Sequence, residues 1–164
     1  MNRQNSRVVL VLKALGALGA FALSAGCGGN QNAQPVTFGE LKPLVKTSCA
    51  LSTSCHAAAS TSSGNLSLAE ADAYCALVGA IQGATYRSTA KSQYAHRVVA
   101  GDKDNSFLYQ KLILAPGDSG PAKPLGTVMP LYQPLDATNI DLFARWIDGG
   151  AQNESGVAAP AGCN

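Results

Sequence analysis

Two cysteines and a histidine lie close together in the sequence, and their chemistry constrains the fold more than any other feature. Cys49 is followed after five residues by Cys55, and His56 comes directly after Cys55. A histidine beside the second of two cysteines is the layout of a c-type haem attachment site, whose usual spacing is Cys-x-x-Cys-His. In such a site both thiols add to haem vinyl groups and the histidine binds the iron. The motif therefore predicts haem attachment, with a wider spacing than usual.

This wider spacing leaves two interpretations open. Residues 50–54 form a larger loop than the usual two-residue connection, and their serine and threonine content would still let both thiols reach the vinyl groups. Exported cysteines normally oxidise and a short loop closes easily, so the alternative is a local disulfide between Cys49 and Cys55. In that case His56 would be a surface histidine without a ligand role. Taken alone, the spacing favours the disulfide.

The first 26 residues have the pattern of a secretory signal. Three basic residues (Arg3, Arg7 and Lys13) precede an apolar run over 14–23, which ends in small residues. That run is too short to cross a membrane comfortably. We therefore expect residues 1–26 to be a signal peptide and the protein to be exported.

Segment 23–27, Leu-Ser-Ala-Gly-Cys, resembles the lipobox of bacterial lipoproteins. In that family the cysteine is lipidated and becomes the mature N-terminus, so the resemblance implies a lipid anchor on Cys27. Gly28 stands where the inner-membrane retention signal would be an aspartate, which implies an outer-membrane lipoprotein of the cell envelope that faces the periplasm. Residues 27–36 are expected to be a flexible tether.

Charge excludes a nucleic-acid partner. The chain has 12 basic and 10 acidic residues, but three of the basic residues lie in the signal, so the mature chain has one more acidic residue than basic. The basic excess of the whole chain belongs to the export signal and predicts no nucleic-acid binding. Removing 26 of the 164 residues leaves 138, enough for one domain with a core.

Caps and apolar spacing predict a mainly helical chain. The expected helices lie at 37–47, 67–78, 104–113 and 136–148. Thr37 with Glu40, and Ser67 with Glu70, form capping-box patterns, Asp136 is a cap, and Gly149-Gly150 is a stop signal. Pro43 would lie inside the first helix, which requires a late start or a kink. Leu108, Leu112 and Ile113 are expected to face inward, and strand signals are weak throughout.

A long loop rich in glycine and proline, residues 115–134, separates the last two expected helices. Such loops are uncommon in compact domains unless they are functional. Met129 lies in this loop, and it is the only methionine left after the signal is removed. A lone methionine is usually an apolar gap-filler. Its thioether is also a soft axial ligand for haem iron, and a Met/His pair raises the reduction potential.

Several motifs, in order, are similar to those of cytochrome-c-like domains of the planctomycete and myxobacterial type. Residues 98–112, VVAGDKDNSFLYQKL, resemble the family segment V-x-x-Gly-Asp-x-x-Asn-Ser-x-Leu-Tyr-x-Lys-Leu. Met129-Pro130 and then residues 146–151, WIDGGA, resemble the family ending Met-Pro followed by Trp-Ile-x-x-Gly-Ala. The resemblance covers about residues 37–152 and leaves 153–164 as a loose tail.

This resemblance implies an all-α fold, a small class I cytochrome-c-like helical domain with long Gly/Pro loops. It also implies one covalently bound haem c, held by Cys49 and Cys55, with His56 and Met129 as the axial ligands of the iron. Adding it to the spacing argument shifts the balance slightly toward haem over the local disulfide.

The other cysteines, histidine and serine motif receive lesser roles. Cys75 and Cys163 could form a disulfide that holds the C-terminal tail to the domain, or Cys163 could be an exposed thiol. His96 is expected at the surface or at a propionate-facing edge, without an assigned role. Segment 117–120, Gly-Asp-Ser-Gly, is interpreted as a turn and not as a protease motif.

The function expected from these features is single-electron transfer by a lipid-anchored monohaem protein, without substrate chemistry of its own. Its partners would be periplasmic or membrane redox proteins. The alternative is a haem-free lipoprotein that keeps the disulfide-bonded scaffold as a binding or structural module. A haem enzyme such as a peroxidase ranks last, because a methionine in the sixth position leaves no site for peroxide.

Overall fold

The computed structural model describes residues 34–59, 63–69, 73–78, 94–120, 122–159 and 163. All the described residues belong to one compact unit, which lies within residues 34–164. The expected signal peptide, Cys27 and most of the expected tether lie outside the described residues. The tether ends before Val36, because this side chain is already buried in the core.

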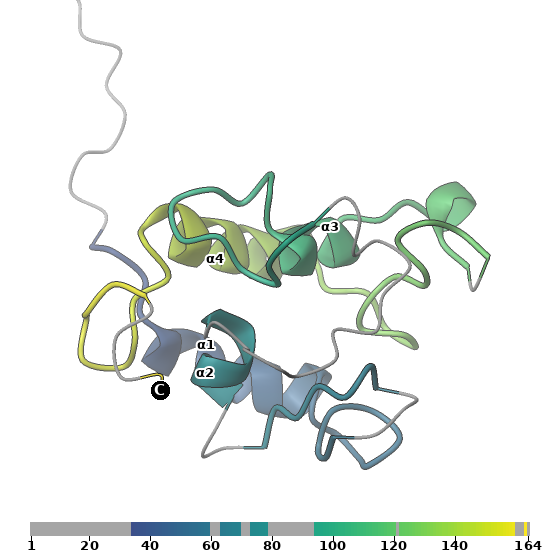
Figure 1. Cartoon of the computed structure of the whole chain (residues 1–164), viewed down its shortest axis with the longest axis horizontal. Helices are drawn as coiled ribbons and strands as arrows, with labels where there is room; N and C mark the ends of the chain where they lie inside the picture. Colours follow the sequence, from purple (N-terminus) through teal and green to yellow (C-terminus); the bar gives the residue numbers. More distant parts are fainter. Residues whose placement is uncertain are drawn as a thin grey trace, which may run out of the picture. The chain divides into compact units, whose positions relative to one another are not determined.

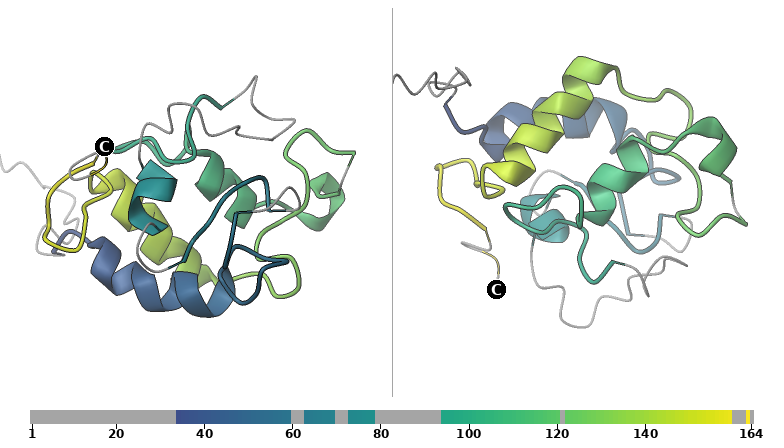
Figure 2. Two further views of the ribbon diagram at one scale, coloured as in Figure 1. Left: turned by 60° about the horizontal axis from the view of Figure 1, so that its bottom comes forward. Right: turned by 90° about the horizontal axis from the view of Figure 1, so that it is seen from above.

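Four α-helices and no strand are found among the described residues (Figure 1). The helices are α1 (Phe38–Ser48), α2 (Ala73–Val78), α3 (Phe107–Leu112) and α4 (Ala137–Asp148), and a short 3-10 helix, η2, covers Pro116–Asp118. Helix α4 packs against both α1 and α3 (Figures 1 and 2). The expected mainly helical class is confirmed for this part of the chain.

Helix α1 begins as its sequence predicts. The Glu40 carboxylate accepts a hydrogen bond from the Thr37 backbone N–H at 2.8 Å, which satisfies a donor that the helix itself leaves open. Pro43 lies inside the helix and the helix continues through it to Ser48. The missing proline N–H removes one backbone hydrogen bond near the start of the helix.

Helix α4 has the expected cap and end. Asp136 Oδ1 accepts from the Asn139 N–H at 2.8 Å, and the helix stops at Asp148, directly before Gly149-Gly150. A Cβ on Gly149 would lie 2.9 Å from the Arg145 carbonyl oxygen, so the close turn requires glycine at this position. The chain then reverses, and the Ala151 N–H donates to the Trp146 carbonyl at 2.8 Å.

The core lies between α1, α2 and α4. Phe38 and Leu41 of α1 meet Trp146 and Ile147 of α4, and all four are almost fully buried. The Phe38 ring lies 5.7 Å from the Trp146 ring and 5.5 Å from that of Tyr74 on α2. Tilted aromatic pairs at such distances add to the stabilisation from burial.

The shorter helices depart from expectation in two places. Helix α2 is described only from Ala73, so the start expected at Ser67 with Glu70 falls partly outside the described residues. Helix α3 ends at Leu112, and Ile113 is 45% exposed. The expectation that Ile113 faces inward is wrong, because this residue ends the helix and the chain turns away from the core there.

A disulfide joins Cys75 of α2 to Cys163, with 5.2 Å between their Cα atoms. This pairing was one of the two alternatives for Cys163 and is confirmed. Residues just before it are also held, since the Ala159 N–H donates to the Gly150 carbonyl at 3.1 Å and the Asn153 N–H donates to the Val157 carbonyl at 2.8 Å. Segment 153–159 is therefore fastened to the domain and is not loose.

Ser106 organises the turn that precedes α3. Its side chain is 0% exposed; its Oγ accepts from the Val99 N–H at 2.8 Å and donates to the Asp102 carbonyl at 2.8 Å. The buried hydroxyl thus pairs with half-buried backbone groups of the turn, namely the Val99 N–H and the Asp102 carbonyl. This role explains the serine before Phe107 better than helix capping, because no side-chain cap bond is made there.

Ser106→Ala is expected to destabilise the protein by about 1–3 kcal/mol, because the half-buried Val99 N–H loses its acceptor. Urea denaturation followed by circular dichroism measures the change. Ser155→Ala is the matched control, since Ser155 is exposed and its side chain makes no hydrogen bond in the described part of the chain. Equal stability of the Ser106 variant and the wild type would contradict the assigned role.

Asp102 gives this turn a pH dependence. Hydrogen bonds from the Asn105 side chain and backbone lower the pKa of its carboxyl group below the usual 3.8. A lowered folded-state pKa stabilises the fold above the unfolded pKa, and this contribution is lost as the pH falls below 3.8 toward the folded-state pKa.

We expect Asp102→Ala to destabilise the protein at pH 7 and to have a smaller effect at a pH below the usual carboxyl pKa of 3.8. Urea midpoints at the two pH values measure the change. Asp118→Ala removes an exposed carboxylate that makes no hydrogen bond within the described ranges, so it separates this effect from loss of charge alone. A difference that does not shrink at low pH would refute the interpretation.

Candidate functional site

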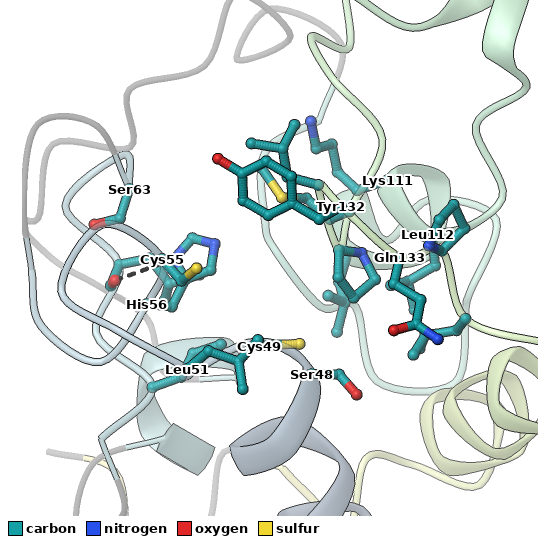
Figure 3. Close-up of a pocket in the computed structure, with 18 of the residues that line it drawn as sticks. Ser48, Cys49, Leu51, Cys55, His56, Ser63, Lys111, Leu112, Tyr132 and Gln133 are labelled. Atoms are coloured by element: carbon teal, nitrogen blue, oxygen red, sulfur yellow. Dashed lines mark hydrogen bonds between the residues drawn. The ribbon is translucent and has the colours of Figure 1, made fainter.

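A pocket of about 640 Å³ opens beside the end of α1 and is lined on its other side by α3 and the loop 115–134 (Figure 3). The pocket is mostly apolar, and its volume lies within the range of cofactor and small-molecule sites. All four residues predicted from the sequence as haem-binding line it, namely Cys49, Cys55, His56 and Met129. Residues far apart in the sequence thus meet at one cavity.

The cysteine loop turns back on itself directly after α1. The Val45 carbonyl accepts from the N–H groups of Cys49 and Ala50, at 2.9 and 3.0 Å. The His56 N–H then donates to the Cys49 carbonyl at 3.1 Å. This backbone bond closes the five-residue loop and places the second cysteine and the histidine beside the first cysteine, despite the unusual spacing.

Cys49 and Cys55 are free thiols in the structure, so the local disulfide that the spacing also allowed is not formed. Both are half-buried and line the pocket (Figure 3). Burial, and secondarily the neighbouring Cys55, raises the pKa of the Cys49 thiol to about 11. Cys49 is therefore a protonated S–H group at neutral pH.

The His56 ring is oriented by one hydrogen bond. Its Nδ1 lies 3.3 Å from the Leu66 carbonyl oxygen, which can only accept, so the proton is assigned to Nδ1. Nε2 has no hydrogen-bond partner among the described residues, which leaves its lone pair available to a metal. Metal-binding histidines commonly donate their other ring N–H to a carbonyl in this way. Sequence reasoning did not identify the Leu66 carbonyl, because no side-chain pattern marks it.

Electrostatics keep His56 neutral. Burial lowers the pKa of the imidazole, and the positive charges of Arg97 and Lys111 lower it further, while the bond to Leu66 opposes the shift. The neutral ring is the form that coordinates a metal. Neither Arg97 nor Lys111 was predicted from the sequence as a pocket residue. For Lys111 a signal was present, because this charged residue directly precedes Leu112, which was expected to face inward.

Lys111 fastens the loop that carries Met129. Its carbonyl accepts from the Met129 N–H at 3.0 Å, and its ammonium donates to the carbonyls of Leu125, at 2.9 Å, and Thr127. Burial lowers the pKa of this ammonium to about 8. Helix α3 therefore sets the position of the long loop, and with it Met129, relative to the pocket.

Ser119 closes the same loop from the other side. Its Oγ accepts from the Val128 N–H at 2.7 Å, and the Gly120 N–H donates to the Gly126 carbonyl at 3.1 Å. The segment 117–120 thus contributes a turn with a structural hydroxyl, as its composition predicts. His96 is exposed and does not line the pocket, and the Cys75–Cys163 disulfide also lies away from it.

Two further observations concern metals and membranes. Within the described ranges, no three His, Cys, Asp or Glu side chains gather in a way that could hold a metal ion. A haem iron needs no such group from the protein, because the porphyrin supplies four of its ligands. In the same part of the chain, no helix combines the length and the apolar character needed to cross a membrane.

No protein-family model matches this chain, and neither a curated protein nor a solved structure matches it.

Proposed function

We propose that the protein binds one haem c covalently in this pocket and transfers single electrons. The observation that carries the proposal is the convergence of two thiols, an imidazole with an available Nε2, and a thioether on one apolar cavity. This donor set fits haem c in kind, since thiols add to vinyl groups and a Met/His pair is an axial ligand set of cytochromes.

Each residue has a distinct role in this proposal. Cys49 and Cys55 would hold the haem covalently, because an S–H bond can add across a vinyl C=C bond, sulfur to one carbon and hydrogen to the other, without an oxidant. His56 would hold the iron through Nε2 and Met129 through its thioether. The mostly apolar lining would limit the access of water to the bound haem. Bound haem supplies a one-electron iron couple, whose potential the Met129 thioether would raise.

The same proposal includes the finer fold assignment. Contact between α1 and α4, together with a long methionine-bearing loop after α3, supports a class I cytochrome-c-like domain. The signal and lipobox patterns support a lipid anchor at Cys27, at the periplasmic face of the outer membrane. Partners would then be periplasmic or membrane redox proteins, and the protein would not be an enzyme.

Expression in a host that attaches haem to exported cysteines tests the proposal. We expect a red protein with a Soret band that survives denaturation, and a mass increase equal to one haem. Cys49→Ala/Cys55→Ala is the matched control, because it keeps His56, Met129 and the Cys75–Cys163 disulfide but removes both attachment points; its haem should be lost on denaturation. Colourless wild-type protein without the added mass would support the haem-free alternative.

A further inference from the structure

The charged side chains that line the pocket are unevenly distributed. Three of the described lining residues are charged, namely Arg97, Lys111 and Asp136. Asp136 is exposed and accepts hydrogen bonds from the backbone and side chain of Asn139, at 2.8 and 3.1 Å, as the cap of α4. Arg97 is only 9% exposed and Lys111 is half-buried. Among the described residues of the lining, the two charged side chains that are buried or half-buried are therefore both cations.

Among the described residues, hydrogen bonds use two of the three N–H donors of Lys111, which leaves the third for a ligand. An ammonium group has three donors, and two of them are used by the carbonyls of Leu125 and Thr127. Both acceptors are neutral, and within the described ranges no carboxylate lies at ion-pair distance from Lys111. Figure 3 shows the Lys111 side chain across the pocket from Cys55 and His56.

Arg97 adds a second cation to the same cavity. Its Nη1 donates to the Ala76 carbonyl at 3.2 Å, which holds the guanidinium beside α2. Both cations lie close enough to His56 for their charges to act on its imidazole. A cationic side chain at the wall of an apolar cavity favours an anionic group on the ligand that occupies the cavity.

We propose that Lys111 and Arg97 form a carboxylate-binding subsite that receives the propionate groups of the haem. The inference rests on the proposed haem function and specifies the part of the ligand that these two residues recognise. Haem is an apolar macrocycle with two carboxylates on one edge, which matches a mostly apolar cavity with two cations in its lining. Lys111 then links two functions, because it also fastens the Met129 loop.

The test compares two ligands that differ only in the proposed contact. Mesohaem carries ethyl groups in place of the vinyls, so it cannot form thioethers with Cys49 or Cys55, and its dimethyl ester lacks both carboxylates. Equilibrium titration of the haem-free mature chain with each compound, under reducing conditions, gives the ratio of the two affinities. We expect the wild type to bind mesohaem roughly tenfold to hundredfold more tightly than the ester, since hydrogen bonds to charged groups contribute about 1.5–3 kcal/mol.

Measuring the ratio of the two affinities in variants shows which residues cause the preference for mesohaem over its ester. Lys111→Met and Arg97→Met should each reduce it, and the double variant should bring it close to one, while Lys111→Arg should keep most of it. Lys111→Met also removes the ammonium hydrogen bonds to the Met129 loop and so weakens the binding of both compounds. This loss is common to both compounds and cancels in the ratio of their affinities.

Each outcome decides the matter. Equal binding of mesohaem and its ester by the wild type would overturn the subsite while leaving haem binding intact. A preference that persists in the double variant would show that other residues bind the propionates and would also overturn it. If the wild type bound neither compound, both the subsite and the haem function on which it rests would fail.

Discussion

Replacing Met129 with leucine is expected to lower the reduction potential of the haem-bound protein and to change the spin state of its iron. Leucine is close to methionine in volume and polarity, and such exchanges usually cost less than about 1.5 kcal/mol. It has no thioether to coordinate with, however. Because axial ligands set haem potentials over a range of about 0.8 V, we expect a fall on the order of 0.1 V. Spectroelectrochemical titration measures the potential, and the visible spectrum reports the spin state.

This substitution separates the two interpretations of a lone methionine. If Met129 only fills space, leucine would preserve the packing, and the spectrum and potential would match those of the wild type. Leu131→Ala is the matched control: this residue lies on the same loop, lines the pocket and is 48% exposed. It should leave the spin state unchanged. A Met129→Leu protein indistinguishable from the wild type would exclude Met129 as a ligand.

Local signals predicted the two longest helices. Asp136, its bond to Asn139 and the Gly149 stop act within a few residues of α4, and the Thr37–Glu40 pair does the same for α1. Such signals do not depend on the rest of the fold, so they can be recognised in the sequence alone. The error at Ile113 has the opposite origin, because apolar spacing alone does not show that α3 ends one residue earlier.

The pocket was predicted only in part for the same reason. Side-chain chemistry marked Cys49, Cys55, His56 and Met129 as a set, and the structure brings all four to one cavity. The supporting contacts use main-chain groups, such as the Leu66 carbonyl that orients His56. Every residue has a carbonyl, so its role becomes visible only when tertiary packing selects one. Loop geometry is similar: the His56–Cys49 backbone bond, which closes the unusual spacing, has no sequence signature.

Trp146→Ala is expected to destabilise the haem-free protein by about 3–5 kcal/mol, since truncation of a buried aromatic leaves a large cavity. Trp146 is 0% exposed and packs against Phe38, and its indole N–H donates to the Gln152 carbonyl at 2.9 Å. Domains of this size are stable by only about 5–15 kcal/mol, so the loss is a large part of the total. Urea denaturation followed by circular dichroism is suitable, because the chain has a single tryptophan and the variant has none.

Two matched variants divide this effect into its causes. Trp146→Phe keeps an aromatic ring but removes one of the two donors to the half-buried Gln152 carbonyl, which still accepts from the Phe38 N–H at 2.9 Å. It is expected to cost about 0.5–1.5 kcal/mol for the lost hydrogen bond, together with a smaller cavity term. Tyr132→Ala removes an aromatic that is 86% exposed, and should change stability by no more than about 0.5 kcal/mol. Similar stability of Trp146→Ala and Tyr132→Ala would show that α4 is not held by this core.

Loss of Trp146 should also reach the pocket through the helices that it holds together. Helix α4 packs against α1, which leads into Cys49, and against α3, which carries Lys111 and so positions the Met129 loop. Helix α4 thus contacts both helices that flank the cavity, α1 on the cysteine side and α3 on the side of the Met129 loop. We therefore expect Trp146→Ala to lower the affinities for mesohaem and for its dimethyl ester by the same factor. The substitution loosens the packing of α1 and α3 but leaves Lys111 and Arg97 in place. Unequal weakening would mean that the core and the charged wall are coupled.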